Sequence, residues 1–506
     1  MKTLNNKTII LALVFISQIG LFTCSSDSPT EKESTEEPIV YTLTSNASTV
    51  DFQSKESSFD VTITTNVDSW VMSTSGTSWI SLSKTSGVSG TSVVKITALA
   101  NTSISPRTST VTINANKVNA VKITINQSGV ASTNGIYPDY NTNPLPANAT
   151  GMSSTATQIA ANISLGWNIG NSLEAIGSET AWGNPKVTKA LIDAVKANGF
   201  NAVRIPCAWN QYMSDATNAK IKTEWLNRVK EVVQYCTDNN MYVLLNIHWD
   251  SGWLENNINE ANKTQVNAKQ KAFWEQIATH LRDFDEHLLF ASANEPAVEN
   301  ATEMSVLTSY HQTFINAVRS TGGKNAYRTL VVQGPSTDIE KTNNLMNTLP
   351  TDTASNRLMV EVHYYTPYQF ALMDVDASWG KMFYYWGTGY HSITDNTRNA
   401  TWGEETDLKN YFKSMKTKFI DIGIPVILGE FAAIRRTSLT GTNLQLHLDS
   451  RAYYLKTVVK ESKANGLLPF YWDAGGLGNN GSGIFNRNTN TVFDTQALTA
   501  LLEGLN

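Results

Sequence analysis

Residues 288–296 read LLFASANEP, a short apolar run of strand length that ends in an asparagine, a glutamate and a proline. Similar apolar runs recur along the second part of the chain, at residues 165–170, 202–206, 242–248, 330–333, 358–364, 426–430 and 468–472. Amphipathic helical patterns lie between them, for example over 187–198, 224–238, 268–282 and 451–463. Eight such strand–helix units over about 350 residues predict an α/β fold, a (β/α)₈ TIM barrel.

Polar and aromatic residues collect where these predicted strands end. Barrel enzymes place their sites at the carboxyl ends of the strands. The ends in question carry Arg204, His248-Trp249-Asp250, Asn294-Glu295-Pro296, His363-Tyr364-Tyr365, Gly429-Glu430-Phe431 and Trp472-Asp473. A carboxylate at the end of an apolar strand contributes little to packing. Glu295 and Glu430, on the fourth and seventh strands, are therefore the candidate catalytic pair.

This ordered set of residues resembles glycoside hydrolase family 5. The segments 166–174 (GWNIGNSLE) and 181–185 (AWGNP) are similar to its subfamily 4, which is rich in endo-β-1,4-glucanases and xyloglucanases. The resemblance covers essentially all of residues 155–506. It implies a retaining glycosidase, with Glu295 as the acid/base and Glu430 as the nucleophile, whose carboxyl groups lie roughly 5–5.5 Å apart.

The chemistry of a retaining enzyme requires one protonated and one ionised carboxyl at the same pH. Arg204 and a hydrogen bond from Tyr365 are expected to favour the Glu430 carboxylate. The charge on Glu430 is then expected to raise the pKa of Glu295 and keep its proton available. His363 is expected to hold sugar hydroxyls or these carboxylates.

The resemblance also implies a set of substrate contacts. Asn294 is expected to hold the sugar 2-hydroxyl, and Trp472 to offer an apolar face to the sugar ring at the cleavage point. Further expected contacts are His248, Asn171, Trp182, Trp249 and Trp253. The last three tryptophans also suit packing within barrel loops, so both interpretations stay open. Trp249 stands where many relatives have a second histidine, which favours a stacking surface there.

Segment 248–254 (HWDSGWL) looks like family members that act on xyloglucan, which makes this branched β-1,4-glucan the favoured substrate. Cellulose, mixed-linkage glucan and glucomannan stay open as substrates. Two other functions also stay open, an exo-acting glycosidase and a non-catalytic surface protein that binds glycans. The intact pair Glu295 and Glu430 argues against the non-catalytic protein.

The first residues predict a location. Residues 1–23 combine two lysines with a short apolar run, which is the pattern of a signal peptide. Cys24 directly follows and resembles the lipidated cysteine of bacterial lipoproteins; an ordinary signal peptide with an incidental cysteine is the alternative. Residues 24–38 are acidic and polar, typical of a flexible tether. We therefore predict a lipid-anchored protein of the outer membrane that faces the exterior.

Residues 39–128 predict a small all-β, immunoglobulin-like sandwich. Short runs alternate β-branched and polar residues between Ser, Gly and Asn turns. The segment resembles the BACON domain, whose name implies carbohydrate binding. It holds only five aromatic residues, Tyr41, Phe52, Phe59, Trp70 and Trp79, and a two-sheet core would use most of them. This favours a spacer over a sugar-binding module, although both stay open.

The remaining features narrow the class of protein. Residues 129–154 are rich in Pro, Asn and Thr and predict a fairly stiff linker before the catalytic domain at 155–506. A net charge of −5 and the lack of a basic stretch argue against nucleic-acid binding. Cys207 and Cys236 are expected to be buried free thiols, with a disulfide as the alternative. No metal or cofactor is expected, and we expect a monomer.

Overall fold

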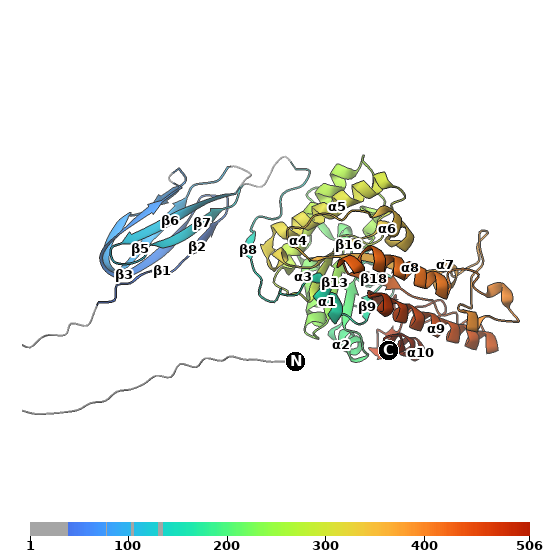
Figure 1. Cartoon of the computed structure of the whole chain (residues 1–506). Coiled ribbons are helices and arrows are strands. Elements are labelled where there is room, and N and C mark those ends of the chain that lie inside the picture. The colour runs from blue at the N-terminus through green and yellow to red at the C-terminus, as the bar shows by residue number, and fades with distance from the viewer. Residues whose placement is uncertain (1–38, 77, 103–105, 130–134) are drawn as a thin grey trace, which may run out of the picture.

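The computed structural model describes residues 39–76, 78–102, 106–129 and 135–506, so the predicted signal peptide, Cys24 and the tether lie outside the described residues. A small β-rich unit precedes a larger α/β unit (Figure 1). The larger unit contains the predicted catalytic residues.

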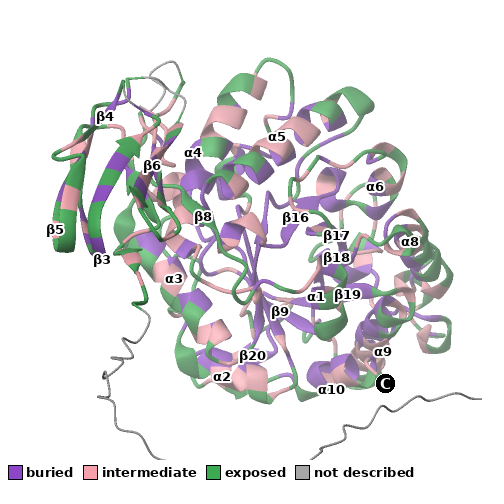
Figure 2. Cartoon of the chain, turned by 60° about the vertical axis from the view of Figure 1, so that its left-hand side comes forward, coloured by how far each residue is buried: buried purple, intermediate pink, exposed green. Residues whose placement is uncertain are grey.

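Eight parallel strands close into a barrel, which confirms the predicted (β/α)₈ fold. In order around the barrel, the strands are β9 (Gly166–Ile169), β10 (Ala202–Ile205), β13 (Tyr242–Asn246), β14 (Leu288–Ala291), β16 (Leu330–Gln333), β17 (Leu358–Tyr364), β18 (Val426–Phe431) and β19 (Leu467–Asp473). The barrel strands are almost entirely buried, at the centre of Figure 2.

Helices surround the barrel and bury their apolar faces against it. They are α2 (Lys189–Ala197), α3 (Thr223–Thr237), α4 (Lys263–Leu281), α5 (Ala301–Ser320), α6 (Ile339–Leu345), α8 (Glu405–Lys418), α9 (Gly441–Asn465) and α10 (Thr495–Glu503), with the short α7 (Tyr368–Ala371) after β17. In α3, Trp225, Val229, Val232 and Cys236 are buried at the spacing of one helix face. Cys236 and Cys207 are both buried free thiols, as predicted.

The interior of the barrel is filled by side chains, and its amino-terminal end is closed by α1 (Ala156–Asn162). Ile159 and Ile163 from this segment pack against inward-facing residues of the strands, including Phe470. Space there is so limited that a Cβ atom on Gly166 would lie 2.1 Å from the Phe470 ring. One end of the barrel is therefore sealed, and chemistry is confined to the carboxyl ends of the strands.

The β-rich unit is a seven-stranded sheet wrapped around its own core. Its strands are β1 (Leu43–Ser45), β2 (Thr49–Phe52), β3 (Ser57–Thr74), β4 (Ile80–Leu82), β5 (Ser86–Ala98), β6 (Arg107–Ala115) and β7 (Val121–Gln127). Pairing is antiparallel except between β2 and β7, which run parallel. The long β3 pairs with β5 along one edge, with a register shift between Thr65 and Ser69, and its other edge pairs first with β1 and then with β6.

Residues 135–154, here named the strap, lie against the barrel. Within the strap, β8 (Leu145–Ala147) pairs in parallel with β15 (Gly322–Gly323), which follows α5. Tyr140 donates its backbone N–H to Glu275 of α4 and its hydroxyl to the Asn218 carbonyl. Arg282 at the end of α4 donates to the Asn143 carbonyl. The segment that the sequence predicts as a linker is thus held to the barrel along much of its length.

Two short hairpins complete the described elements, β11 (Met213–Asp215) with β12 (Lys220–Ile221) and β20 (Phe485–Asn486) with β21 (Thr491–Val492). Within the described ranges, no helix combines the length and the apolar character needed to span a bilayer.

Candidate active site

Glu295 and Glu430 meet at the carboxyl ends of the barrel strands. Glu430 lies within β18 and is buried, whereas Glu295 lies four residues beyond the end of β14 and is exposed on one side. A carboxylate oxygen of each residue and a ring nitrogen of His363 all lie within 4.8 Å of one another. This separation is close to the roughly 5–5.5 Å found between the two carboxyls of retaining glycosidases, and well below the roughly 6.5–9.5 Å of inverting ones.

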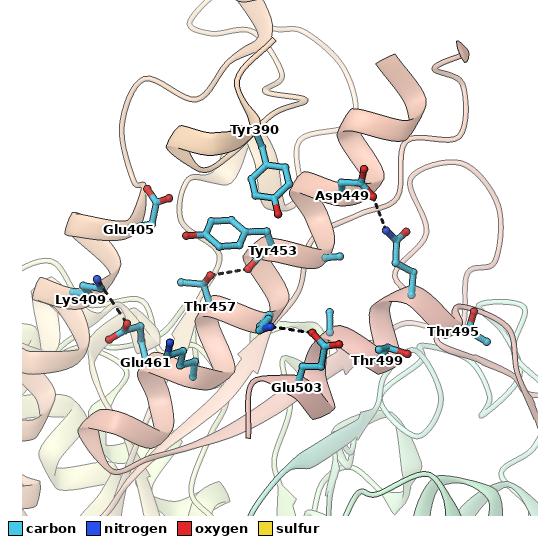
Figure 3. A pocket seen from close by; sticks show the side chains of 15 residues that line it. Tyr390, Glu405, Lys409, Asp449, Tyr453, Thr457, Glu461, Thr495, Thr499 and Glu503 are labelled. Carbon is cyan, nitrogen blue, oxygen red and sulfur yellow. Dashed lines mark hydrogen bonds and ion pairs between the residues drawn. The ribbon is translucent and has the colours of Figure 1, made fainter. Parts of the chain in front are cut away.

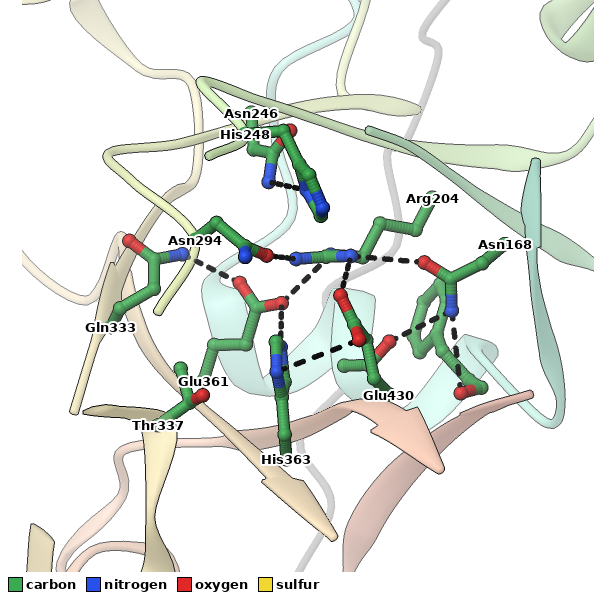
Figure 4. Close-up of polar contacts among 12 residues, drawn as sticks. Asn168, Arg204, Asn246, His248, Asn294, Gln333, Thr337, Glu361, His363 and Glu430 are labelled. Atoms are coloured by element: carbon green, nitrogen blue, oxygen red, sulfur yellow. Dashed lines mark hydrogen bonds and ion pairs between the residues drawn. The ribbon is translucent and has the colours of Figure 1, made fainter. Parts of the chain in front are cut away.

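Arg204, on β10, is fully buried and lies between Asn294, Glu361 and Glu430 (Figure 4). Its guanidinium pairs through Nη1 with Glu430 Oε1 at 2.7 Å and donates through Nη2 to Asn294 Oδ1 at 2.8 Å. Its Nε lies 2.8 Å from Glu361 Oε1. The planar guanidinium therefore fixes a nucleophile candidate, an amide and a second carboxylate in one geometry.

Tyr365 donates its hydroxyl to the other oxygen of Glu430, Oε2, at 2.8 Å. Both oxygens of Glu430 thus have a fixed donor, as the sequence predicted for Arg204 and Tyr365. Burial and, to a smaller extent, the charge of Glu295 hold the pKa of Glu430 above its ordinary value, and His363, Arg204 and Tyr365 act in the opposite direction.

His363 connects the two glutamates to a third. Its Nδ1 lies 2.7 Å from Glu295 Oε1 and 3.8 Å from Glu430 Oε2, and its Nε2 lies 3.2 Å from Glu361 Oε1. Burial acts to lower the pKa of His363, but the surrounding carboxylates, Glu430 first, raise this pKa to about 9.

The acid/base candidate differs from its prediction in one respect. The sequence predicted a raised pKa for Glu295. Desolvation does act in that direction, but the hydrogen bond and the charge of His363 outweigh it and lower the pKa of Glu295. In the free protein the proton between Glu295 and His363 therefore rests on His363. The sequence could not indicate this, because it does not give the 2.7 Å distance between the two side chains.

His248 and Trp472 form one wall of the site. Their rings lie nearly parallel, with an interplanar angle of 10° and centroids 5.8 Å apart. Burial, followed by the positive charges of Arg204 and His363, lowers the pKa of His248 well below its usual value. His248 is therefore neutral, able both to accept and to donate a hydrogen bond.

The other predicted contact residues divide into two groups. Asn171, Trp182 and Trp472 line one hollow of about 390 Å³, and Trp182 is 46% exposed there. Trp249 is 44% exposed and free to face a ligand. Trp253, by contrast, packs edge-on against Phe273 of α4 and donates its Nε1 to Asp250. Its surroundings are those of a packing residue.

Several residues that support the site were not predicted from the sequence. Glu361, fully buried on β17, pairs with Arg204 and His363 and accepts from Gln333 Nε2 at 2.6 Å. Glu255 accepts the backbone N–H of Glu295 at 2.7 Å, and burial raises its pKa to about 7. A usable signal did exist for Glu361. It is a glutamate inside an apolar strand, two residues before His363, and such residues share one face of the strand.

Glu361 also explains a glycine at the nucleophile. A Cβ atom on Gly429, directly before Glu430, would lie 2.0 Å from Glu361 Oε1. The backbone of β18 can therefore pass close to the Glu361 carboxylate only because residue 429 has no side chain.

Two further features have the form of a binding site. Among the described residues, only Glu295, His363 and Glu430 bring three metal-ligand atoms together, and hydrogen bonds within the site already engage these atoms. A larger hollow of about 820 Å³ lies between α8, α9 and α10 (Figure 3). Four of its charged side chains form ion pairs, Lys456 with Glu503 and Lys409 with Glu461, and it contains none of the predicted site residues.

Comparison with known proteins places this geometry among polysaccharide hydrolases. Residues 168–478 match the family described as cellulase (glycosyl hydrolase family 5), and residues 68–128 match the BACON family of N-terminal domains. The xyloglucan-specific endo-beta-1,4-glucanase of Bacteroides ovatus is 37% identical over 416 residues, which cover 79% of each chain.

Solved structures show the same similarity. The Bacteroides ovatus GH5 xyloglucanase in complex with a XXXG heptasaccharide superposes with a TM-score of 0.67 at 34% identity, covering 92% of this chain and 100% of that one. A broad specificity endoglucanase of GH5 subfamily 4 from Ruminococcus champanellensis, with bound cellotriose, gives a TM-score of 0.59 at 35% identity. It covers 69% of this chain and 98% of that chain.

Proposed function

Because the chain belongs to glycosyl hydrolase family 5, as its sequence predicted, we propose that it is a retaining endo-β-1,4-glucanase whose preferred substrate is xyloglucan. The observation that carries this proposal is the pair of carboxylates, Glu295 and Glu430, within 4.8 Å of each other at the open end of the barrel. That spacing leaves no room for a water between the nucleophile and the sugar, which supports double displacement.

The surroundings of each carboxylate suit its role. In the first step Glu430, held by Arg204 and Tyr365, attacks the anomeric carbon while a protonated Glu295 gives its proton to the leaving oxygen. In the second step Glu295 takes a proton from water. This water attacks the anomeric carbon and releases the sugar from Glu430. The partly exposed position of Glu295 suits a group that must reach both the leaving oxygen and water.

Asn294 and Trp472 suit the sugar at the cleavage point. Asn294 commits its Oδ1 to Arg204, so its NH₂ group is directed as a donor, which fits a contact with the sugar 2-hydroxyl. Trp472 is held parallel to His248 and supplies a flat apolar face for a pyranose ring.

Xyloglucan is the substrate that the Bacteroides ovatus relatives are named for, and segment 248–254 supports the same choice. A broader action on unbranched β-1,4-glucans is the second candidate, because the similar Ruminococcus champanellensis enzyme has broad specificity. The test is hydrolysis of xyloglucan, carboxymethyl cellulose, mixed-linkage glucan and glucomannan, with sizing of the products. Xyloglucan cut to oligosaccharides at the highest kcat/KM supports the proposal. Equal rates on all four polymers would favour the broad-specificity enzyme, and release of single sugars only would contradict endo action.

We further propose that the protein is lipidated at Cys24 and displayed on the outer membrane. The support is the sequence alone, a charged and apolar leader followed by a cysteine and an acidic tether. A Cys24→Ala variant should move from the membrane to the soluble fraction without loss of specific activity. Retention of this variant in membranes would contradict lipidation, and resistance of the wild type to protease on intact cells would contradict external display.

For the β-rich unit we propose the role of a spacer. Trp70 and Trp79 are 1% and 8% exposed in its core, and Phe52 is also buried. The Lys117 ammonium donates to the Tyr41 hydroxyl and lies 4.4 Å from the centre of the Tyr41 ring, which covers one face of that ring and leaves Phe59 as the exposed ring. A single ring is a small platform for a polysaccharide. Affinity electrophoresis of this unit in xyloglucan gels should show no retardation, and clear retardation would replace the spacer with a binding module. Light scattering of the whole protein should report the monomer predicted above.

A further inference from the structure

Glu361 is a buried carboxylate that does not reach the substrate cleft. It lies on β17, is fully buried, and has both oxygens engaged. Oε1 faces Arg204 Nε at 2.8 Å and His363 Nε2 at 3.2 Å, and Oε2 accepts from Gln333 Nε2 at 2.6 Å. Burial acts to raise the pKa of Glu361, but Arg204 and then His363 lower it, so the group is ionised.

An ionised carboxylate only accepts hydrogen bonds, which decides the protonation of His363. Its Nε2, which faces Glu361, must carry the hydrogen. The nitrogen that gains and loses a proton is then Nδ1, and this atom faces Glu295 Oε1 at 2.7 Å. A buried carboxylate that orients an imidazole toward a reacting group is the arrangement of the Ser-His-Asp hydrolases, in which Asp sets the tautomer of His.

We propose that Glu361 is a positioning residue that holds His363 with Nε2 protonated, so that His363 Nδ1 stores the proton which Glu295 delivers to the leaving oxygen. The proposal rests on the endo-glucanase function above. It adds a third carboxyl group to a reaction in which only Glu295 and Glu430 act on the substrate.

During turnover one proton passes from His363 through Glu295 to the leaving oxygen. Before the substrate binds, His363 is an imidazolium and Glu295 a carboxylate. As the sugar excludes water, the proton moves from Nδ1 to Glu295 Oε1 and then to the glycosidic oxygen, while Glu430 forms the bond to the anomeric carbon. The glycosidic C–O bond breaks in this step and the proton leaves with the released chain, so His363 is neutral throughout the lifetime of the glycosyl–enzyme. In the second step water attacks the anomeric carbon and displaces Glu430, while Glu295 takes the proton of this water and returns it to Nδ1.

Other charged or titratable groups face His363 and Glu295, and none of them is altered when Glu361 is substituted. Arg204 faces it from β10, Glu430 from β18 and Tyr365 from the end of β17. His248 and Glu255 face it from the segment after β13.

The test is the isosteric variant Glu361→Gln, which keeps the shape and removes the charge. With xyloglucan, kcat should fall about 10²-fold, the lower end of what general acid catalysis contributes, while KM changes by less than about threefold. Loss of a neighbouring negative charge favours loss of the proton from His363, so the basic limb of the pH–rate profile should move to lower pH by about one unit. An activated aryl cellobioside needs little acid assistance and should lose much less rate.

Glu275→Gln is the matched control. Glu275 is as buried as Glu361 but lies on α4, where it pairs with Lys271 away from the site. This control should keep the wild-type basic limb, and Glu361→Asp, which restores the charge, should shift the limb back toward wild type. Equal losses of Glu361→Gln on both substrates with an unchanged basic limb would overturn the proposal.

A second measurement is made on the wild-type protein without substrate, and it needs a variant only to assign the His363 signals. In ¹⁵N NMR of histidine-labelled protein, with His363 assigned by the loss of its signals in His363→Gln, Nε2 should stay protonated across the accessible pH range. Nδ1 alone should titrate. A neutral His363 with Nδ1 protonated and Nε2 bare would overturn the proposal. Because this readout involves no sugar, inactivity of the wild type on xyloglucan would count against the proposed function and leave the test of Glu361 intact.

Discussion

At the scale of single residues, the site is built from side chains that come from distant parts of the sequence. The residues at the strand ends could be predicted because each interrupts an apolar run, and Glu295 and Glu430 follow from that pattern. The direction of the Glu295 pKa could not be predicted, because it depends on the short contact with His363.

The nucleophile assignment makes the first prediction. Glu430→Ala should lower kcat on xyloglucan at least about a thousandfold, because no other carboxylate can form the covalent intermediate. Binding of xyloglucan oligosaccharides, measured by calorimetry, should change little. Alanine leaves Arg204 without one of its partners, so Glu430→Gln serves as a second variant, whose amide oxygen can still accept from Arg204. Activity within about tenfold of wild type in either variant would contradict the assignment.

The acid/base assignment makes a different prediction. Glu295→Ala should lose most activity on natural polysaccharide but far less on an aryl cellobioside with a good leaving group, since that oxygen leaves without protonation. Added azide should then restore turnover on the activated substrate, because a small anion can replace the water that Glu295 activates. The measurement is kcat/KM on both substrates with and without azide, and equal losses on the two substrates would count against the acid role.

At the scale of elements, the strand–helix alternation of the barrel was predictable from periodicity, whereas the contacts of the strap were not. Residues 135–154 show no regular spacing of apolar residues, and their composition is typical of a linker. The strap is held through backbone groups and isolated side chains, as in Tyr140 with Glu275 and in the pairing of β8 with β15. Such contacts leave no pattern that composition or periodicity could detect.

Glu275 connects the strap to the pH dependence of stability. It accepts the Tyr140 N–H and pairs with Lys271 at 2.6 Å, yet burial raises its pKa to about 7, against an ordinary value of 4.5. A raised folded-state pKa gives stability that is fully present below the unfolded pKa and is lost as pH rises through about 7. In Glu275→Gln this dependence is absent.

The measurement is the difference in Tm between Glu275→Gln and wild type by calorimetry. The Tm of Glu275→Gln relative to that of wild type should increase as pH rises from 5 to 8. A constant difference across that range would contradict the raised pKa of Glu275.

At the scale of the whole molecule, we expect the strap to stabilise the barrel, and we expect the β-rich unit before it to affect neither the stability nor the turnover of the barrel. Chains that begin at residue 129 and at residue 155 form a matched pair, because only the second lacks the strap. The first should keep the wild-type Tm of the barrel and the wild-type turnover of soluble xyloglucan. The second loses several hydrogen bonds of about 0.5–1.5 kcal/mol each, and its Tm should fall by about 5 °C or more.

The measurements are the Tm of each chain by calorimetry and the kcat of each chain on soluble xyloglucan. Equal Tm values would mean that the strap contributes nothing to the barrel. A large loss of turnover in the longer chain would instead assign the β-rich unit a part in catalysis.

The close approach of Gly429 to Glu361 restricts how this chain can diverge. A methyl group at position 429 would collide with the Glu361 carboxylate, so the substitution is excluded while Glu361 is present. Once residue 361 is shortened, position 429 becomes free to gain a side chain, and a reversion to glutamate would then be blocked. The two positions are epistatic, and the order of mutations matters. The added Cβ would also lie 2.8 Å from Cγ of Glu361, so an aspartate there does not remove the collision. Among homologues, a non-glycine residue at 429 should therefore occur only with alanine or glycine at 361, and that combination would mark lineages in which His363 has lost its buried carboxylate partner.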